Sequence, residues 1–238
     1  MKYPIKQQTF LFIFLVGTAS MGRAQISSGL SEKIGFTEKA LFRIFQGGKE
    51  IGKETFQIQC SPGQWKGSSD LTLHLKGQDP IAIHAETTLD EKGKFLAYEA
   101  QRTGEGPKMK IRVLLEDGIA ICEEKGDYTS ETNPVKVDPD FQLLDTNVFH
   151  HYALLALRLA MNPQIPQIQA LIPQEATAGS LKVKNAAKEI LKIGKKRIPV
   201  DRYELDSGQT KLSLWIDQEG KLYKILVPQT NAEVVRSE

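Results

Sequence analysis

Four histidines are the residues of this chain whose type and spacing could do chemistry, and two of them flank a turn. Matching the apolar faces pairs Leu73 with Ile83, which sets His74 and His84 on one polar face at a diagonal of about 7–8 Å. Glu86 shares that face, so these three polar side chains form a hypothesis for a divalent-ion site or a hydrolase. An ordinary solvated face explains the same pattern. We therefore predict neither a metal site nor a catalytic residue here.

His150 and His151 follow one another in a segment that favours a helix. Neighbouring side chains on a helix project about 100° apart, so we expect one imidazole to face the sheet and the other to face outward. That arrangement suits packing or capping better than shared ligation. The chain also lacks the G-x-S-x-G, H-E-x-x-H, C-x-x-C, P-loop and G-x-G-x-x-G motifs. The sequence thus predicts a protein that is not an enzyme and needs no cofactor.

Cys60 and Cys122 are the two cysteines of the chain. An oxidising compartment would permit a disulfide, which needs Cα atoms about 4.4–6.8 Å apart. The sequence does not fix that distance. A Cys60–Cys122 disulfide and two half-buried thiols at strand positions therefore both stay open.

The segments around these residues have the pattern of β-strands. From Ala40 onward, short alternating apolar and polar runs are separated by turn signals such as Gly47-Gly48 and Asp117-Gly118. The connections are too short for crossover helices, which excludes a parallel sheet. We predict a mainly β fold, a large curved antiparallel sheet or half-open barrel of about 10–12 strands. Residues 126–144 are expected to form a long surface loop, and residues 185–193 are left open between helix and strand.

One principal helix is expected over Val148–Met161, with Asp145 or Thr146 as its cap and Asn162-Pro163 as its stop. Its apolar residues cover more than one stripe. A helix of this kind packs into the concave face of a curved sheet.

The first 24 residues resemble an export signal in their order of charge, apolarity and small residues. Lys2 and Lys6 precede the apolar run Phe10–Val16, and Gly22-Arg23-Ala24 offers small residues at a cleavage site. The apolar run is far shorter than the roughly 20 residues that span a bilayer. We expect cleavage after Ala24, a periplasmic or secreted location, and no stable membrane insertion afterwards. The rest would divide into a lead-in (25–39), one curved-sheet domain (40–228) and a polar tail (229–238).

Charge gives the chain no general attraction to polyanions. It has 31 basic and 29 acidic residues, and loss of the signal would remove three of the basic ones. Residues 182–202 nevertheless hold eight basic and two acidic side chains, and residues 116–140 hold eight acidic and two basic ones. The two segments could attract each other as solvated faces, or the basic segment could bind phosphate or lipid headgroups. We favour the first interpretation. The basic segment lacks interleaved aromatic residues, so we predict no nucleic-acid binding.

Three stretches carry a family resemblance. They are Phe42–Phe56 with its Gly-Gly turn, Leu144–Phe149 at the helix start, and the closing hairpin with Leu214–Asp217 and Gly220–Leu222. Together they resemble an uncharacterised family of exported bacterial proteins, known only as a domain of unknown function, whose nearest described relative has a LolA/LolB-like curved β-sheet. The resemblance spans most of Ala40–Pro228 and transfers no catalytic residue. In the LolA/LolB-like proteins a half-open barrel shelters the acyl chains of lipoproteins, so the resemblance implies lipid binding.

We therefore expect an exported envelope protein that binds a hydrophobic or lipid-like ligand between sheet and helix without catalysis. The candidate lining residues are Leu73, Ile83, Phe95, Ile111, Val113, Leu155 and Trp215. The alternative is a structural or partner-binding envelope module with a filled core, which would meet another envelope protein through its edge strands or residues 126–144. A hydrolase ranks third. A hollow of several hundred Å³ would favour the first hypothesis over the second.

Overall fold

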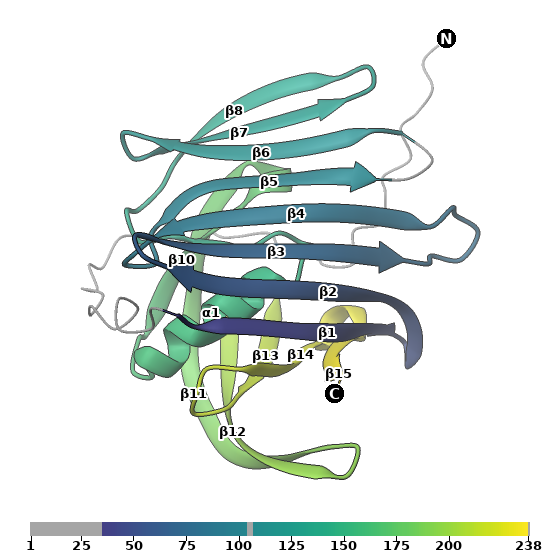
Figure 1. Ribbon diagram of the computed structural model, residues 1–238, viewed down its shortest axis with the longest axis vertical. Helices are drawn as coiled ribbons and strands as arrows, with labels where there is room; N and C mark the ends of the chain where they lie inside the picture. Colours follow the sequence, from purple (N-terminus) through teal and green to yellow (C-terminus); the bar gives the residue numbers. More distant parts are fainter. Residues whose placement is uncertain (1–34, 104–106, 238) are drawn as a thin grey trace.

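The computed structural model describes residues 35–103 and 107–237. Within them, one sheet of 15 strands wraps around a single α-helix (Figure 1). The expected signal peptide (1–24) and the lead-in up to residue 34 lie outside the described residues.

The sheet is a meander that runs in both directions from a central pair of strands. In chain order its strands are β1 (Thr37–Gln46), β2 (Lys49–Ser61), β3 (Gln64–Leu73), β4 (Ile81–Asp90), β5 (Phe95–Thr103), β6 (Met109–Glu116), β7 (Ile119–Gly126), β8 (Ser130–Lys136), β9 (Gln142–Leu143), β10 (Gln167–Ile172), β11 (Thr177–Ile193), β12 (Lys196–Asp206), β13 (Lys211–Ile216), β14 (Leu222–Val227) and β15 (Ala232–Ser237). β1 pairs with β15, β2 to β8 follow β1 on one side, and β14 back to β9 follow β15 on the other. All neighbours are antiparallel except β9 and β10, which are parallel.

The expected polar tail is wrong, because its residues form the strand that joins the two halves of the sheet. β15 lies between β1 and β14, with Ile44 opposite Val234 and Val227 opposite Ala232. Ala232 and Val234 are buried on the inner face. Three small apolar residues beside charged ones are a weak strand pattern, and central pairing on both sides outweighs it.

Residues 126–144 do not form one long loop. β8 lies at one edge of the sheet and β9 at the other. Pro134 sits in β8 opposite Ile121, a placement that an edge strand tolerates because one side of it needs no ladder hydrogen bonds. Residues 185–193, left open by the sequence, belong to β11. These additions raise the strand count from the expected 10–12 to 15.

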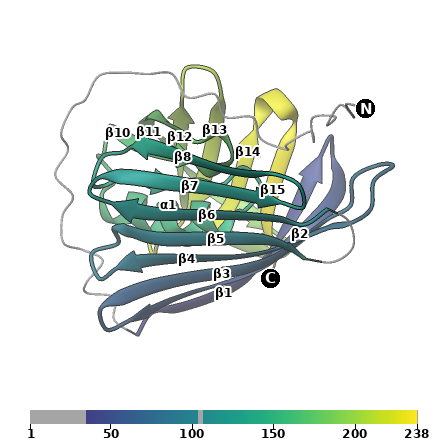
Figure 2. The ribbon, with the colours of Figure 1, turned by 90° about the horizontal axis from the view of Figure 1, so that it is seen from above.

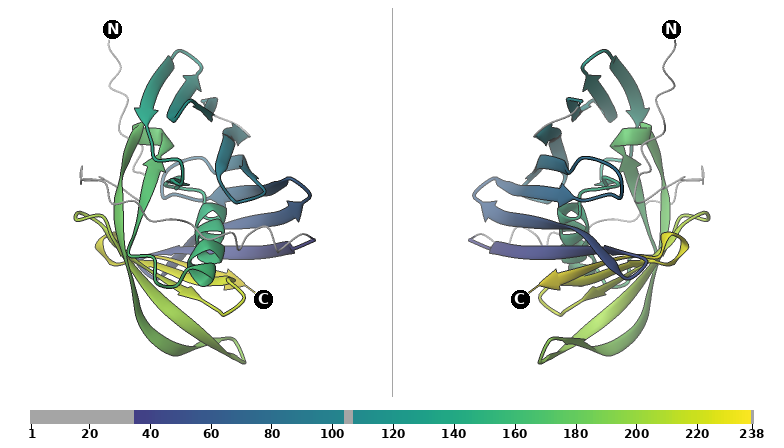
Figure 3. Two further views of the ribbon diagram at one scale, coloured as in Figure 1. Left: turned by 90° about the vertical axis from the view of Figure 1, so that its left-hand side faces the viewer. Right: turned by 90° about the vertical axis from the view of Figure 1, so that its right-hand side faces the viewer.

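The sheet curls around α1 (His150–Met161) without closing, since β8 and β9 pair with no further strand among the described residues. Figures 2 and 3 show the helix enclosed between the β1–β8 half and the β9–β15 half. Nine of its twelve residues are buried, which requires contact on nearly every side. The helix ends at Met161 as expected, but it begins two residues later than Val148. No helix among the described residues is long and apolar enough to cross a bilayer.

Two clusters of buried apolar side chains fill the space around α1. The larger joins α1 to β1–β3 and β10–β15, and the smaller lies under β4–β7. Ile83 and Leu89 of β4 pack against both clusters, so the interior is continuous. This continuity supports one domain rather than two lobes.

Candidate functional site

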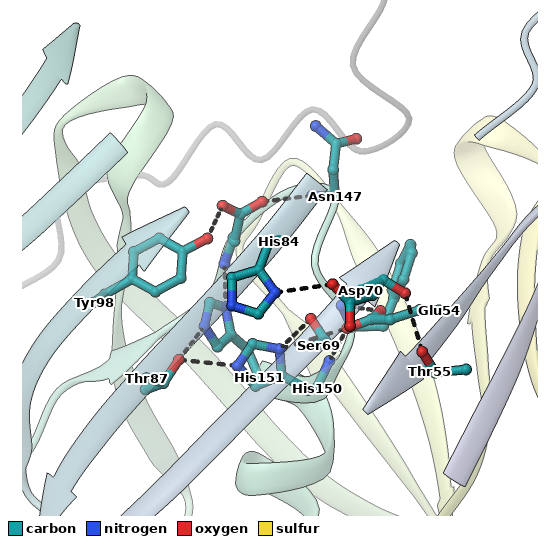
Figure 4. A network of polar contacts seen from close by, with 12 residues as sticks. Glu54, Thr55, Ser69, Asp70, His84, Thr87, Tyr98, Asn147, His150 and His151 are labelled. Atoms are coloured by element: carbon teal, nitrogen blue, oxygen red, sulfur yellow. Dashed lines mark hydrogen bonds and ion pairs between the residues drawn. The ribbon is translucent and has the colours of Figure 1, made fainter. Parts of the chain in front are cut away.

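A buried carboxylate from β2 binds the amino end of α1. Alternation along β2 turns Glu54 inward with Phe56 and Ile58, and its side chain is fully buried. Its two oxygens accept the backbone N–H groups of Phe149 at 2.7 Å and His150 at 3.1 Å (Figure 4). A carboxylate here meets unpaired N–H donors and the positive end of the helix dipole. The predicted cap at Asp145 or Thr146 is wrong, because the residue before the helix is Phe149 and Glu54 takes over the capping role.

Both histidines of α1 face the interior and share one hydroxyl. Thr87 Oγ1 lies 2.9 Å from His150 Nε2 and 2.8 Å from His151 Nε2. The two ring centroids are 4.4 Å apart, and neither side chain has measurable exposure. The prediction that one imidazole faces outward is wrong. Directions 100° apart both meet protein when a helix is enclosed on nearly every side.

The hydrogen-bond partners of His151 fix where its ring proton lies. The backbone N–H of Asp145 donates to His151 Nδ1 at 3.1 Å, so the proton of that ring is on Nε2 and is donated to Thr87. Thr87 Oγ1 also contacts His150 Nε2, and His150 Nδ1 lies 3.0 Å from Ser69 Oγ and 3.5 Å from Glu54 Oε1. One chain of polar contacts thus runs from Asp145 through both imidazoles to Glu54.

Asp145 is held from the opposite side by β5. The Tyr98 hydroxyl donates to its Oδ2 at 2.5 Å, and the Asn147 N–H donates to Oδ1 at 2.8 Å. Burial raises the pKa of Asp145, although these two hydrogen bonds oppose the rise. The pKa of Tyr98 is well above its usual value, because burial and the neighbouring carboxylate both disfavour a phenolate.

Burial lowers the pKa of His151 well below its usual value, and the nearby His150 lowers it further. A neutral imidazole agrees with the proton assignment drawn from the geometry. Geometry and burial therefore both favour the neutral form of the His151 ring.

Gly67 of β3 makes room for the histidine pair. It lies opposite Thr87 in the ladder, and a Cβ placed on it would lie 2.9 Å from His150 Cδ2. The backbone of β3 can approach the His150 ring only because residue 67 has no side chain. The network thus draws on β2, β3, β4, β5 and the start of α1 together. It positions a helix, and among the described residues no group of three or more His, Cys, Asp or Glu side chains is placed to hold a metal ion.

The polar face suggested by sequence is only partly assembled. His84 Nδ1 lies 2.8 Å from Asp70 Oδ1, and His84 Nε2 lies 3.5 Å from Glu86 Oε1, all on exposed side chains. His74 is not part of this group, because Thr72 rather than His74 lies opposite Ala82. The predicted register is wrong by two residues. Alternation with period two fits either register, and β3 ends at Leu73, so the turn is longer than expected.

Most predicted lining residues are packed side chains of the interior. Leu73 and Leu155 lie in the larger cluster, and Phe95, Ile111 and Val113 lie in the smaller one. Ile83 contacts both clusters. Trp215 belongs to neither: its indole N–H donates to Glu189 at 2.9 Å, and Lys224 lies over its ring.

The two cysteines do not form a disulfide. Both are buried free thiols, and they lie in different clusters, Cys60 in the larger and Cys122 in the smaller. Burial raises the pKa of both, that of Cys122 to about 11.

The structure has a small cavity beside the polar network and a larger depression on the sheet. A small one of about 20 Å³, room for about one water molecule, touches Asp145, Asn147 and Gln174. A broad open depression of about 650 Å³ lies over β1–β3 and β15, where Lys39, Gln57 and Asp70 are among its lining residues. Ser69, which contacts His150 in the interior network, also lines this depression.

The fold and this interior define a β-barrel-like protein with an open sheet wrapped around one helix. The chain belongs to the family described as a domain of unknown function, DUF6134, whose model matches residues 42–236. It is also similar in fold to a β-barrel-like protein of the domain of unknown function DUF1849 from Brucella abortus, seen in a crystal structure. That similarity has a TM-score of 0.56 and 12% sequence identity, and it covers 86% of this chain and 96% of the other. No curated protein matches the sequence.

Sequence reasoning missed Glu54, Ser69, Thr87 and Tyr98. One signal was present for Glu54: it is a lone carboxylate between Gly52 and Phe56 on the buried face of an alternating strand. Such a residue needs a partner inside the protein, and here the partner is the end of the helix.

Proposed function

We propose that this chain is an exported, non-catalytic envelope protein that binds an apolar, lipid-like ligand between α1 and the inner face of the sheet. The observation that carries the proposal is that two clusters of apolar side chains line the inner face of an unclosed sheet, and that one short helix covers this face. A ligand enters when α1 moves aside and then takes over part of the apolar contact.

The helix is the element best suited to move. A helix of 12 residues has marginal stability by itself, so α1 depends on packing and on Glu54 and Thr87 for its position. The sheet, in contrast, is joined by continuous strand pairing from β8 to β9. Displacing α1 would expose an intact apolar wall, on which burial of an alkyl chain contributes about 0.8 kcal/mol per CH₂.

Two interior polar atoms support a ligand with a polar group. The Trp65 indole N–H and the Tyr152 hydroxyl are buried and have no hydrogen-bond partner among the described residues. An unpaired buried donor costs about 1–3 kcal/mol, which a ligand oxygen could relieve.

A filled interior favours the second candidate, a partner-binding envelope module. The predicted lining residues are packed, and the cavity beside Asp145 holds about one water molecule. The outer depression over β1–β3 and β15 would then be the recognition surface.

Native mass spectrometry of protein purified from its host without detergent separates the two candidates. The proposal predicts an N-terminus at Gln25 and a fraction of molecules with a lipid adduct that is lost on denaturation. A processed N-terminus without any adduct, and without uptake of an added fatty acid, would favour the partner-binding module. An unprocessed N-terminus would contradict export.

A further inference from the structure

The long hairpin of β11 and β12 extends beyond the rest of the sheet. β11 pairs with β10 only up to Lys182, and β12 pairs with β13 only from Asp201 onward. Between these points residues 189–193 and 196–200 pair only with each other, as a two-stranded ribbon (Figure 1). Gly194 turns the chain with φ of 56°.

One face of this ribbon is exposed and cationic. Alternation and register place Lys188, Ile190 and Lys192 on the same side as Arg197 and Pro199, with Ile190 opposite Pro199 and Lys192 opposite Arg197. The half-buried Asp201 lies opposite Lys188 at the base of this face. The other five residues are exposed, and 56% of the Ile190 surface is accessible to solvent. We call these five residues the cationic ribbon face. An apolar pair at its centre is thus flanked by three cations.

Two acidic residues of the segment 116–140 pair with cations outside this face. Within residues 116–140, Glu123 pairs with Arg112, and Asp140 pairs with Lys94, on the other half of the sheet. Arg202, at the base of the ribbon, pairs with Glu189 and Glu204. None of these four ion pairs joins the basic segment to the acidic segment, so they give no support to the expected attraction between the two segments.

We propose that the cationic ribbon face docks on an anionic bilayer surface. The lysine ammonium groups and the arginine guanidinium group would contact lipid phosphates. Ile190, beside Pro199, would enter the interfacial region of the bilayer. A two-stranded ribbon that packs on no third strand is marginal in water, so a surface that receives its exposed apolar side chain would also order it. The inference is independent of the ligand proposed for the interior, because the ribbon lies outside the space around α1.

The test is co-sedimentation of the protein, purified from its host with a verified N-terminus, with large unilamellar vesicles. The vesicles contain phosphatidylcholine alone or with about 30 mol% phosphatidylglycerol, which gives the vesicle surface a negative charge. We expect binding to the anionic vesicles that weakens as salt rises, and little binding to phosphatidylcholine alone. Equal binding to both, or none to either, would overturn the proposal.

A charge-matched pair of variants locates the surface. The triple variant Lys188→Gln, Lys192→Gln, Arg197→Gln should lose about 100-fold in partition coefficient, at about fivefold per charge. The control Lys49→Gln, Lys53→Gln, Lys66→Gln changes net charge equally at exposed positions of β2 and β3 and should keep most of the binding. Equal losses in the two triples would show attraction by net charge only and would refute a specific face.

Ile190→Ser tests the apolar contribution. It should weaken binding to anionic vesicles while leaving the dependence on salt unchanged, since it removes no charge. Far-ultraviolet circular dichroism and the urea midpoint confirm that the variants fold. Binding to an acidic protein but not to anionic vesicles would assign the face to a different partner and reject the bilayer.

Discussion

The Glu54 carboxylate accepts the backbone N–H of Phe149 at 2.7 Å, although the two residues are 95 positions apart in the chain. This contact joins the first half of the sheet to the helix that follows it. It also means that the position of α1 depends on a buried charge rather than on apolar packing alone. A buried carboxylate at a helix end interacts strongly with the helix N–H groups, so removal of the Glu54 carboxylate should destabilise the whole helix.

Glu54→Gln should lower the free energy of unfolding by about 1–3 kcal/mol, because a buried charge-assisted cap is replaced by a neutral amide. Urea denaturation followed by tryptophan fluorescence measures the change. Glu50→Gln, an exposed position on the same strand, is the matched control and should leave the midpoint nearly unchanged. Similar shifts for the two variants would contradict a special role for Glu54.

Thr87→Val should cost about 1–3 kcal/mol, because it leaves two buried imidazole nitrogens without the hydroxyl that they share. Thr88→Val makes the same substitution at the next position of β4, which points to the outer face, and it should be neutral within about 0.5 kcal/mol. A loss at Thr88 as large as that at Thr87 would indicate a strand effect rather than a network effect.

Gly67→Ala should destabilise the fold by about 1–3 kcal/mol, because the added Cβ would lie 2.9 Å from a His150 ring held on two sides. Its effect should not add to that of Thr87→Val, since both substitutions release the same ring. Additive effects in the double variant would show that the two positions act on different groups.

Stability should fall as pH drops from about 6.5 toward 5. The pKa of His151 is lowered in the fold, so on acidification the unfolded chain takes up a proton before the folded chain does. The contribution of neutral His151 to stability is therefore complete above about pH 6.5 and is lost as the pH falls. The raised pKa of exposed His84 has the opposite sign: its contribution is present below about pH 6.5 and is lost as pH rises. His84→Gln should therefore steepen the loss of stability on acidification. Urea midpoints at several pH values check this, and a rise in stability between pH 7 and 5.5 in His84→Gln would contradict it.

The two thiols should be unreactive in the native protein, because both are buried and their pKa values are raised. Alkylation with iodoacetamide at pH 8 should label neither cysteine until denaturant is added, and then both. A mass lower by the two hydrogens of a disulfide would contradict the free thiols.

The sequence predicted the β class, the curved sheet and the end of α1, because alternation, short turns and Asn162-Pro163 are local signals. It did not predict that β15 joins the two halves, since that position depends on β1 and β14 rather than on the strand itself. The sequence also did not predict that both histidines point inward. Their partners, Ser69 and Thr87, lie 81 and 63 positions before His150, and no local pattern records such a distance.

The central claim is that α1 occupies the space that an apolar ligand would take. Titration with a dansylated fatty acid, combined with hydrogen exchange of α1, tests it most directly. Loosening α1 by about 1–2 kcal/mol should raise apparent affinity by about five- to thirtyfold. We predict that Thr87→Val binds the probe more tightly than the wild type and Thr88→Val do, and that the bound probe speeds exchange of the α1 amides. Absence of saturable fluorescence in all three proteins, or binding that leaves α1 protected, would contradict the account.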